Sequence, residues 1–247
     1  MQLTERVYLV GSGSNGFGLS HDSDCHVYLI DGGSELALVD AGAGPGVAEI
    51  LANVRQHGFD PNRIHSLLLT HIHADHAGGA AALRAAVPGL RVLVSKEAAP
   101  YLREGNEKAI SLDLGKKAGY YAPEYMFQPC PVARELAEGD EIQVGELKLQ
   151  VLDTPGHALG HVAFVMQDQG MTFLFCGDTL FFGGRILLQS IWDCDLQAHI
   201  ASLRKLGALP VDVFLPGHLT FSLRNGQRHF QTALDLIDRC LVPPSIF

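Results

Sequence analysis

A cluster of histidines around one aspartate follows an apolar, strand-like run in the first third of the chain. The segment 71–76 reads HIHADH. We expect His71, His73 and Asp75 to alternate onto one face of an extended segment. A turn before the following pair of glycines then brings His76 to the same cavity. Imidazole nitrogens and carboxylate oxygens are typical ligands of zinc and related ions, so this segment predicts a metal site.

Two other interpretations of this segment are weaker. A solvated surface loop would favour lysine, serine and glutamate over imidazole. A zinc-protease helix of the H-E-x-x-H type needs a glutamate after the first histidine and a second histidine four places on. At those two positions this chain has Ile72 and Asp75.

Three further turns place a histidine or an aspartate at the end of a predicted strand. The motifs are T-P-G-H ending at His157, G-D-T around Asp178 and P-G-H ending at His218. Each alone is weak, because a single loop histidine or aspartate is more often a turn residue than a ligand. Together with the cluster, they are too many to be independent coincidences.

The ordered set of these four motifs resembles the metallo-β-lactamase superfamily, and most closely its glyoxalase II-like hydrolases. The resemblance covers most of the chain, and it implies two metal ions with an open position on each. The implied ligands are His71, His73 and His157 for the first metal, Asp75, His76 and His218 for the second, and Asp178 as a bridge. It also gives Asp75 and Asp178 a catalytic role in orienting the nucleophile. His161 is expected to act behind the ligands.

The resemblance implies a dinuclear metal-dependent hydrolase in which a metal-bridging hydroxide attacks an ester-type bond, such as a thioester, a lactone or a related carbonyl. Two divalent ions are the expected cofactors, with zinc first and iron or manganese as alternatives. The competing functions are an iron-dependent persulfide dioxygenase, a metal-dependent phosphodiesterase and a non-enzymatic metal-stabilised binding module. We expect a small-molecule substrate; its identity, any use of glutathione and the oligomeric state stay open.

The composition limits the partners and the compartment. Of 247 residues, 18 are Lys or Arg and 27 are Asp or Glu, and the net charge of −9 disfavours nucleic acid and anionic membranes. The five cysteines form no C-x-x-C pair, which indicates a reducing compartment. The N-terminal residues lack the pattern of a signal peptide, and no apolar run is long enough to span a membrane. We therefore expect a cytoplasmic protein.

Short β-branched runs alternate with amphipathic stretches along the chain, which predicts an α/β fold. The expected class is a four-layer αβ/βα sandwich, the metallo-β-lactamase fold, with two mixed β-sheets flanked by helices in a single domain over residues 1–247. Strands are expected near 7–10, 26–30, 36–40, 64–70, 91–94, 141–144, 147–152, 162–167, 171–176, 185–189 and 211–215. Helices are expected near 45–57, 79–87, 96–104, 195–206 and 226–240.

Two segments outside the motifs carry further hypotheses. An excursion at about 105–130, near the active site, is rich in aromatic residues and is expected either to cover the site as a lid or to plug the domain edge. It concentrates five large residues that suit either role: Tyr120, Tyr121, Tyr125, Met126 and Phe127.

The other segment is 11–16, which matches G-x-G-x-x-G, although no helix is expected after it, so we predict a mobile loop rather than a dinucleotide site. Nearby polar side chains are interpreted as a solvated loop, with substrate contact as the alternative: His21, Asp22, Asp24 and His26. Asp40, at a strand end, is expected to accept a hydrogen bond that orients a ligand histidine, with a simple turn residue as the alternative.

Overall fold

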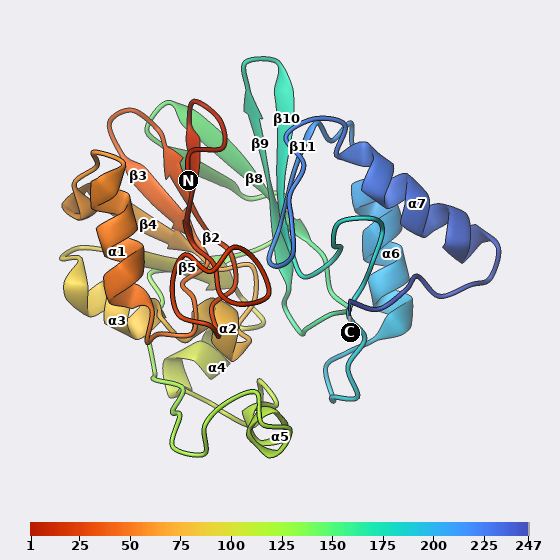
Figure 1. Ribbon diagram of the computed structural model, residues 1–247, viewed down its shortest axis with the longest axis horizontal. Helices are drawn as coiled ribbons and strands as arrows, with labels where there is room; N and C mark the ends of the chain where they lie inside the picture. Colours follow the sequence, from red (N-terminus) through yellow and green to blue (C-terminus); the bar gives the residue numbers. More distant parts are fainter. Residues whose placement is uncertain (247) are drawn as a thin grey trace. The chain divides into compact units, whose positions relative to one another are not determined.

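The computed structural model describes residues 1–246, and the chain divides into two compact units, each built on one β-sheet (Figure 1). The first unit contains residues 1–136 and 144–146, and the second contains residues 137–143 and the chain from Leu147 onward. The predicted metal ligands are therefore divided between the units, with the cluster 71–76 in the first and the three later ligands in the second.

The sheet of the first unit is mixed, in the order β1-β2-β3-β4-β5-β6. Strands β1 to β3 are antiparallel, whereas β3 to β6 are parallel. Parallel neighbours need crossover connections, and helices supply them. The strands are β1 (Val7–Gly11), β2 (Val27–Asp31), β3 (Leu36–Val39), β4 (Ile64–Leu68), β5 (Arg91–Ser95) and β6 (Arg134–Leu136). The helices are α1 (Val47–Gln56), η1 (Pro61–Arg63), α2 (Ala74–Ala77), α3 (Ala80–Ala86), α4 (Ala99–Glu104) and α5 (Leu112–Lys117).

The core of the first unit lies between this sheet and its helices. Helix α1 buries Val47, Ile50, Leu51 and Val54 along one stripe, at the spacing that places side chains on a single helical face. The strands β1 and β3 are buried along their whole length, as expected of strands covered on both faces.

The sheet of the second unit is also mixed, in the order β11-β10-β9-β8-β7. Strands β10 and β11 are parallel, while β9 runs antiparallel to both β8 and β10. The strands are β7 (Glu141–Val144), β8 (Leu147–Asp153), β9 (Val162–Asp168), β10 (Met171–Gly177) and β11 (Val213–Pro216). Helices α6 (Leu196–Gly207) and α7 (Gln227–Asp238) pack together and cover residues of β9, β10 and β11.

The predicted order of strands and helices is confirmed at most positions, with five differences, one of which is the short helix η1 that the prediction lacks. The strand expected at 185–189 is wrong, because only single bridges form there, at Arg185 and Ile186. The short strand β6 and the short helices α2 and α5 are absent from the prediction. Within residues 1–246, none of the helices combines the length and the apolar character needed to cross a membrane.

Candidate metal centre

In the first unit, the predicted ligands leave the sheet at one edge. The cluster follows β4 and Asp40 follows β3, and these two parallel strands end at the same edge. The ring centroids of His71 and His76 are 4.0 Å apart, and those of His71 and His73 are 4.7 Å apart. The structure therefore brings the three imidazoles of the cluster together.

The fourth member, Asp75, reaches the histidines by a different backbone from the one expected. Asp75 and His76 lie on the single helical turn α2, so the extended segment predicted for 71–75 is wrong from Ala74 onward. On this turn, Oδ2 of Asp75 is 3.7 Å from Nε2 of His76. The predicted grouping of the four side chains is nevertheless present.

The carboxylate of Asp40 fixes the protonation of two of these histidines. Its Oδ2 accepts a 2.8 Å hydrogen bond from Nδ1 of His76, which leaves Nε2 of the neutral ring without a proton. The Thr70 hydroxyl donates to the same carboxylate at 2.9 Å, because an ionised carboxylate only accepts. With its one proton used, the Thr70 oxygen accepts from Nδ1 of His71 at 3.0 Å. Both histidines thus have an Nε2 without a proton, which is the form that binds a metal.

These contacts test two sequence inferences. The expected hydrogen bond between Asp40 and a histidine of the cluster is present, at His76, whose role as a metal ligand stays a prediction. Thr70 is a site residue that the sequence analysis misses, and its only signal is its place directly before His71. Asp40 has a φ of 63°, a left-handed backbone that aspartate tolerates better than most residues.

Cys25 lies beside this network without being one of the predicted ligands. One potential ligand atom each from Cys25, Asp40 and His76 lies within 4.8 Å of the other two. Burial raises the pKa of the Cys25 thiol to about 12, so the sulfur stays protonated at neutral pH and is a poor ligand. Because Nδ1 of His76 is already bonded to Asp40, we assign Cys25 to packing.

In the second unit, sheet direction places three predicted ligands at one edge. Strands β8, β10 and β11 run in the same direction, because β9 is antiparallel to its two neighbours and β10 is parallel to β11. His157, Asp178 and His218 each follow one of these strands within four residues. Gly217 N–H also donates to the Gly177 carbonyl at 2.8 Å, which ties two of the ligand loops together.

Asp178 lies at equal distance from the two histidines of this unit. Its Oδ2 is 3.6 Å from Nε2 of His157 and 3.6 Å from Nε2 of His218. This separation is too long for a hydrogen bond. It is close to the spacing of about 3.4 Å that two ligands adopt around one tetrahedral zinc at bond lengths of about 2.0 to 2.1 Å. All three side chains are buried, and imidazole and carboxylate are donor types that fit divalent metal ions.

His161 positions Asp178 through the backbone. Asp178 N–H donates to Nε2 of His161 at 3.1 Å. Nδ1 of the neutral ring is then the protonated nitrogen, and it donates to the Thr154 hydroxyl at 2.8 Å. Both ring nitrogens of His161 are engaged with these partners, which supports the view that it acts behind the ligands.

The turn that carries His157 is held by the start of helix α6. A Cβ at Gly156 would collide with the backbone of His199, and the φ of 133° at this position also requires glycine. Asp195 N–H donates to the Gly156 carbonyl at 2.8 Å, and Leu159 N–H donates to Oδ2 of Asp193 at 3.1 Å. These contacts restrain the turn that carries His157.

The excursion at 105–130 belongs to the first unit and is only partly consistent with a lid. Phe127 is 3% exposed and packs in the hydrophobic core, so the lid interpretation is wrong for this residue. Tyr120 and Met126 are exposed, at 64% and 66%. Tyr121 donates a hydrogen bond to Oδ1 of Asp75 at 3.3 Å. Burial raises the pKa of the Tyr121 phenol well above its usual value, and the Asp75 charge raises it further, so it remains a donor.

The next element after the glycine-rich segment 11–16 is strand β2, so the helix that a dinucleotide motif requires does not follow it, as expected. The mobile loop expected here has instead a dense set of backbone hydrogen bonds, such as Gly13 N–H to the Asp24 carbonyl at 2.9 Å. Asp24 and His26 are buried, and their side chains bond to Ala43 N–H and the Ser12 hydroxyl, so the solvated-loop interpretation is wrong for these two.

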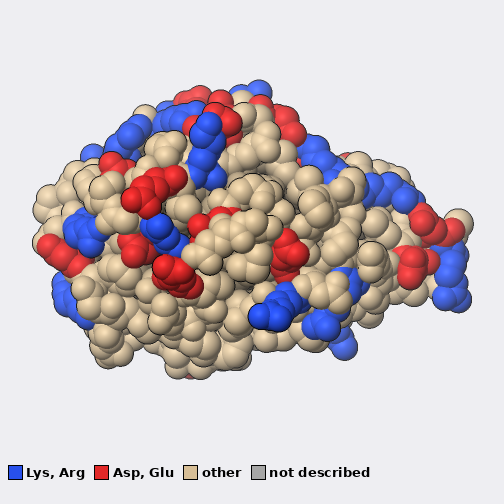
Figure 2. All heavy atoms as spheres, turned by 90° about the horizontal axis from the view of Figure 1, so that it is seen from above, with Lys and Arg blue, Asp and Glu red and all other residues tan. Residues whose placement is uncertain are grey.

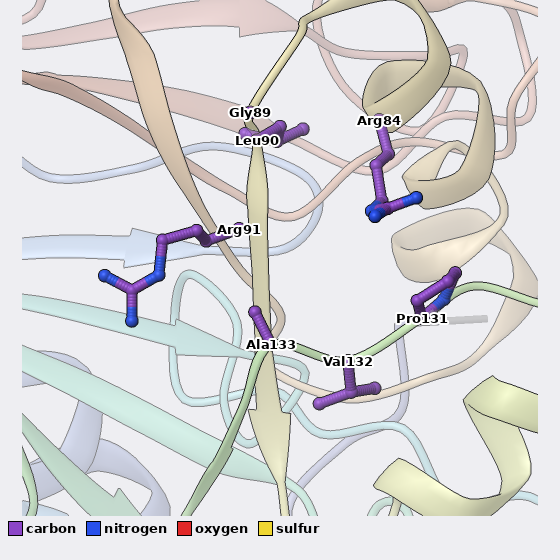
Figure 3. Close-up of a pocket in the computed structure, with 7 residues that line it drawn as sticks. All are labelled: Arg84, Gly89, Leu90, Arg91, Pro131, Val132 and Ala133. Atoms are coloured by element: carbon purple, nitrogen blue, oxygen red, sulfur yellow. The ribbon is translucent and has the colours of Figure 1, made fainter.

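A surface hollow elsewhere in the first unit carries none of the predicted ligands. Its volume is about 380 Å³, and Figure 3 shows the side chains of Arg84 and Arg91 on opposite sides of strand β5, so they do not form a convergent pair. Its other lining residues are Gly89, Leu90, Pro131, Val132 and Ala133. On the face shown in Figure 2, acidic and basic side chains are interspersed, without a continuous basic tract.

Comparison with known proteins identifies the family. A model of the metallo-β-lactamase superfamily matches residues 22–218, and the chain belongs to this superfamily. A subclass B3 metallo-β-lactamase of Bradyrhizobium japonicum superimposes with a TM-score of 0.73 at 22% identity, covering 97% of this chain and 91% of that one. The predicted fold class is therefore confirmed, and this fold implies divalent metal ions.

Two curated relatives are similar in sequence. A hydroxyacylglutathione hydrolase of Cereibacter sphaeroides is 33% identical over 199 residues, which is 79% of this chain and 63% of that protein. An atrochrysone carboxyl ACP thioesterase of Aspergillus fumigatus is 29% identical over 212 residues, which is 85% of this chain and 55% of that protein. The chain thus spans less than two thirds of the length of these relatives.

Proposed function

We propose that the chain is a metal-dependent hydrolase of ester-type bonds that holds two divalent ions. The proposed ligands are His71, His73 and His157 for the first ion, Asp75, His76 and His218 for the second, and Asp178 for both. These side chains are divided between the two units. The proposal therefore includes a single functional domain over residues 1–247.

The observation that carries the proposal is the position of Asp178. One of its carboxylate oxygens lies 3.6 Å from Nε2 of His157 and of His218, the histidines assigned to different ions. A carboxylate in this position is suited to bridge two metals. The first unit supplies further ligands of the same chemistry. They are the unprotonated Nε2 atoms of His71 and His76 and the carboxylate of Asp75.

When bound, two such ions polarise a carbonyl oxygen and lower the pKa of water, so that hydroxide is available near neutral pH. The chain's own residues then have limited tasks: Asp75 and Asp178 orient the nucleophile, and Asp40 holds the ring of His76 in place. A cysteine nucleophile is disfavoured, because burial raises the pKa of both Cys25 and Cys176.

The names of the relatives support a particular substrate class. One is a hydroxyacylglutathione hydrolase and another is an ACP thioesterase, which places a thioester first among the ester-type bonds. Within the proposal, zinc is the first choice of metal, because imidazole and carboxylate ligands suit it. The five cysteines are free thiols, which supports a cytoplasmic location.

The test combines metal analysis with a substrate panel. Protein loaded with zinc should contain about two ions per chain, and Asp178→Ala should lower the occupancy of both positions and abolish turnover. Asp168→Ala is the matched control, because Asp168 ends β9 at the opposite edge of the same sheet and should keep both ions. Hydrolysis should be fastest with thioesters in a panel that also contains lactone, β-lactam and phosphodiester compounds.

Three outcomes would contradict the proposal. At most one ion per chain after reconstitution refutes the dinuclear site. Near-normal activity of Asp178→Ala removes Asp178 from that site. Bound iron together with thiol-dependent oxygen uptake would select the dioxygenase function instead.

A further inference from the structure

Two tyrosines of the excursion at 105–130 reach the segment that carries the first-unit ligands. Tyr121 donates to Oδ1 of Asp75 at 3.3 Å. Tyr125 donates to the carbonyl of Ala43 at 2.7 Å and also contacts the carbonyl of Ala74, the residue directly before Asp75. The excursion is therefore bonded to both the side chain and the backbone around this carboxylate.

The two oxygens of Asp75 have different neighbours. Oδ1 accepts the hydrogen bond of Tyr121, whereas Oδ2 lies 3.7 Å from Nε2 of His76. The direction of the tyrosine bond is fixed, because the ionised carboxylate has no proton to give. Tyr121 thus holds the carboxylate by one oxygen and turns the other toward the histidine.

The support behind Tyr121 is rigid. Its ring packs against that of Tyr125, with centroids 5.1 Å apart. A Cβ at Gly78 would collide with the Tyr125 hydroxyl, so the glycine makes room for this contact. Phe127, two residues further on, is anchored in the hydrophobic core. The segment from Tyr121 to Phe127 is therefore held against the first unit by these contacts.

Asp75 needs such support more than the histidines do. Its side chain is 23% exposed, whereas His71 and His76 are fully buried and their rings are bonded to Thr70 and Asp40. It also lies on a helix of a single turn, whose own hydrogen bonds restrain it weakly. A carboxylate in this situation can rotate unless a neighbour fixes it.

We propose that Tyr121 is a positioning residue that presents Oδ2 of Asp75 to the second metal ion. This inference rests on the proposed function. Partners that orient a ligand from behind change metal affinity by about 10 to 100-fold. The excursion then contributes to the metal centre through one hydroxyl, in addition to any contact that its exposed residues make with substrate.

The test is a Co²⁺ titration of the metal-free full-length protein, followed by visible absorption and by competition with a chelator. Tyr121→Phe retains the ring and removes only the hydroxyl. It should weaken the second Co²⁺ equivalent by about 10 to 100-fold and alter the absorption band of that equivalent, with the first equivalent unchanged. Tyr120→Phe, at the exposed neighbouring tyrosine, is the matched control and should titrate as the wild type does.

The outcomes separate the two proposals. If the wild type binds two ions and Tyr121→Phe gives the same second affinity and spectrum, the positioning role is refuted and the dinuclear function stands. If the wild type binds only one ion, both are refuted. Thermal unfolding of the metal-free proteins checks the fold of the variant. If Tyr121→Phe and the control unfold at the same temperature, a loss of second-site affinity belongs to the hydroxyl and supports the role.

Discussion

Nδ1 of His76, on helix α2, donates a 2.8 Å hydrogen bond to Oδ2 of Asp40, which directly follows β3, and both side chains are buried. The same carboxylate receives the Thr70 hydroxyl, which in turn receives Nδ1 of His71. One acidic group therefore sets the protonation of two histidines, and the first prediction concerns its removal.

Asp40→Asn should weaken metal binding by about 10 to 100-fold, because an amide offers one acceptor oxygen where the carboxylate offers two. Asparagine tolerates the left-handed backbone at this position, so the substitution tests the charge and the acceptor capacity and not the turn. Metal affinity measured by chelator competition checks the result. Asp31→Asn, at the half-buried end of β2, is the control and should change the affinity little.

The second prediction separates His157 from His161. His157→Ala should lose one ion outright, because it removes a proposed ligand. His161→Ala should keep two ions with an affinity lower by about 10 to 100-fold. It should also lower the free energy of unfolding by about 1 to 3 kcal/mol, since Asp178 N–H and the Thr154 hydroxyl lose their buried partner. Elemental analysis of both variants checks the assignment, and the opposite pattern would reverse it.

The third prediction distinguishes core from surface within the excursion. Phe127→Ala should lower the free energy of unfolding by about 3 to 5 kcal/mol, because its side chain is buried in the hydrophobic core. Met126→Ala, at an adjacent position that is 66% exposed, should change it by less than about 0.5 kcal/mol. Urea unfolding of the two variants measures the difference. Equal effects would show that Phe127 is not a core residue.

The fourth prediction concerns His229 on helix α7. Burial, with a smaller effect from Arg228, lowers the pKa of its imidazole to about 4. Gly183 N–H donates to Nδ1, and Nε2 bonds to the Ser222 hydroxyl, an arrangement that requires the neutral ring. The unfolded chain binds the proton near pH 6.5, so this group makes the protein less stable as the pH falls from about 6.5 to about 4.

NMR titration of the imidazole checks this shift directly. The His229 signal should show no protonation above pH 5, and His229→Gln should reduce the loss of stability between pH 6.5 and pH 4. Ordinary titration near pH 6.5 would contradict the buried neutral ring.

The sequence predicts the long apolar strands and most of the amphipathic helices, because burial sets their periodicity. It fails for α2, α5 and β6, which span only a few residues and depend on their surroundings. It also misassigns 185–189, where Ile186 is buried but Leu188 is 37% exposed and no ladder forms. An apolar run alone does not show whether a partner strand is present.

The proposed ligands are recognisable in the sequence because they occur in short motifs at strand ends. Their supporting contacts are less visible. Asp40 is predicted from its place at a strand end, but Thr70 is not, because a threonine in an apolar run has no distinguishing pattern. The bond between Tyr121 and Asp75 joins residues 46 positions apart, and no local spacing indicates it.

The hydrogen bond between Leu159 N–H and Asp193 connects the His157 turn to the neighbourhood of a natural fluorophore. The chain has a single tryptophan, and Trp192 is the immediate neighbour of the residue that holds the His157 turn. Its indole is 58% exposed, so its emission is sensitive to changes in local polarity. The tryptophan fluorescence of the unlabelled protein therefore comes from one indole, which is next in sequence to a residue bonded to the His157 turn. Metal binding at His157 can be followed by this fluorescence without a dye.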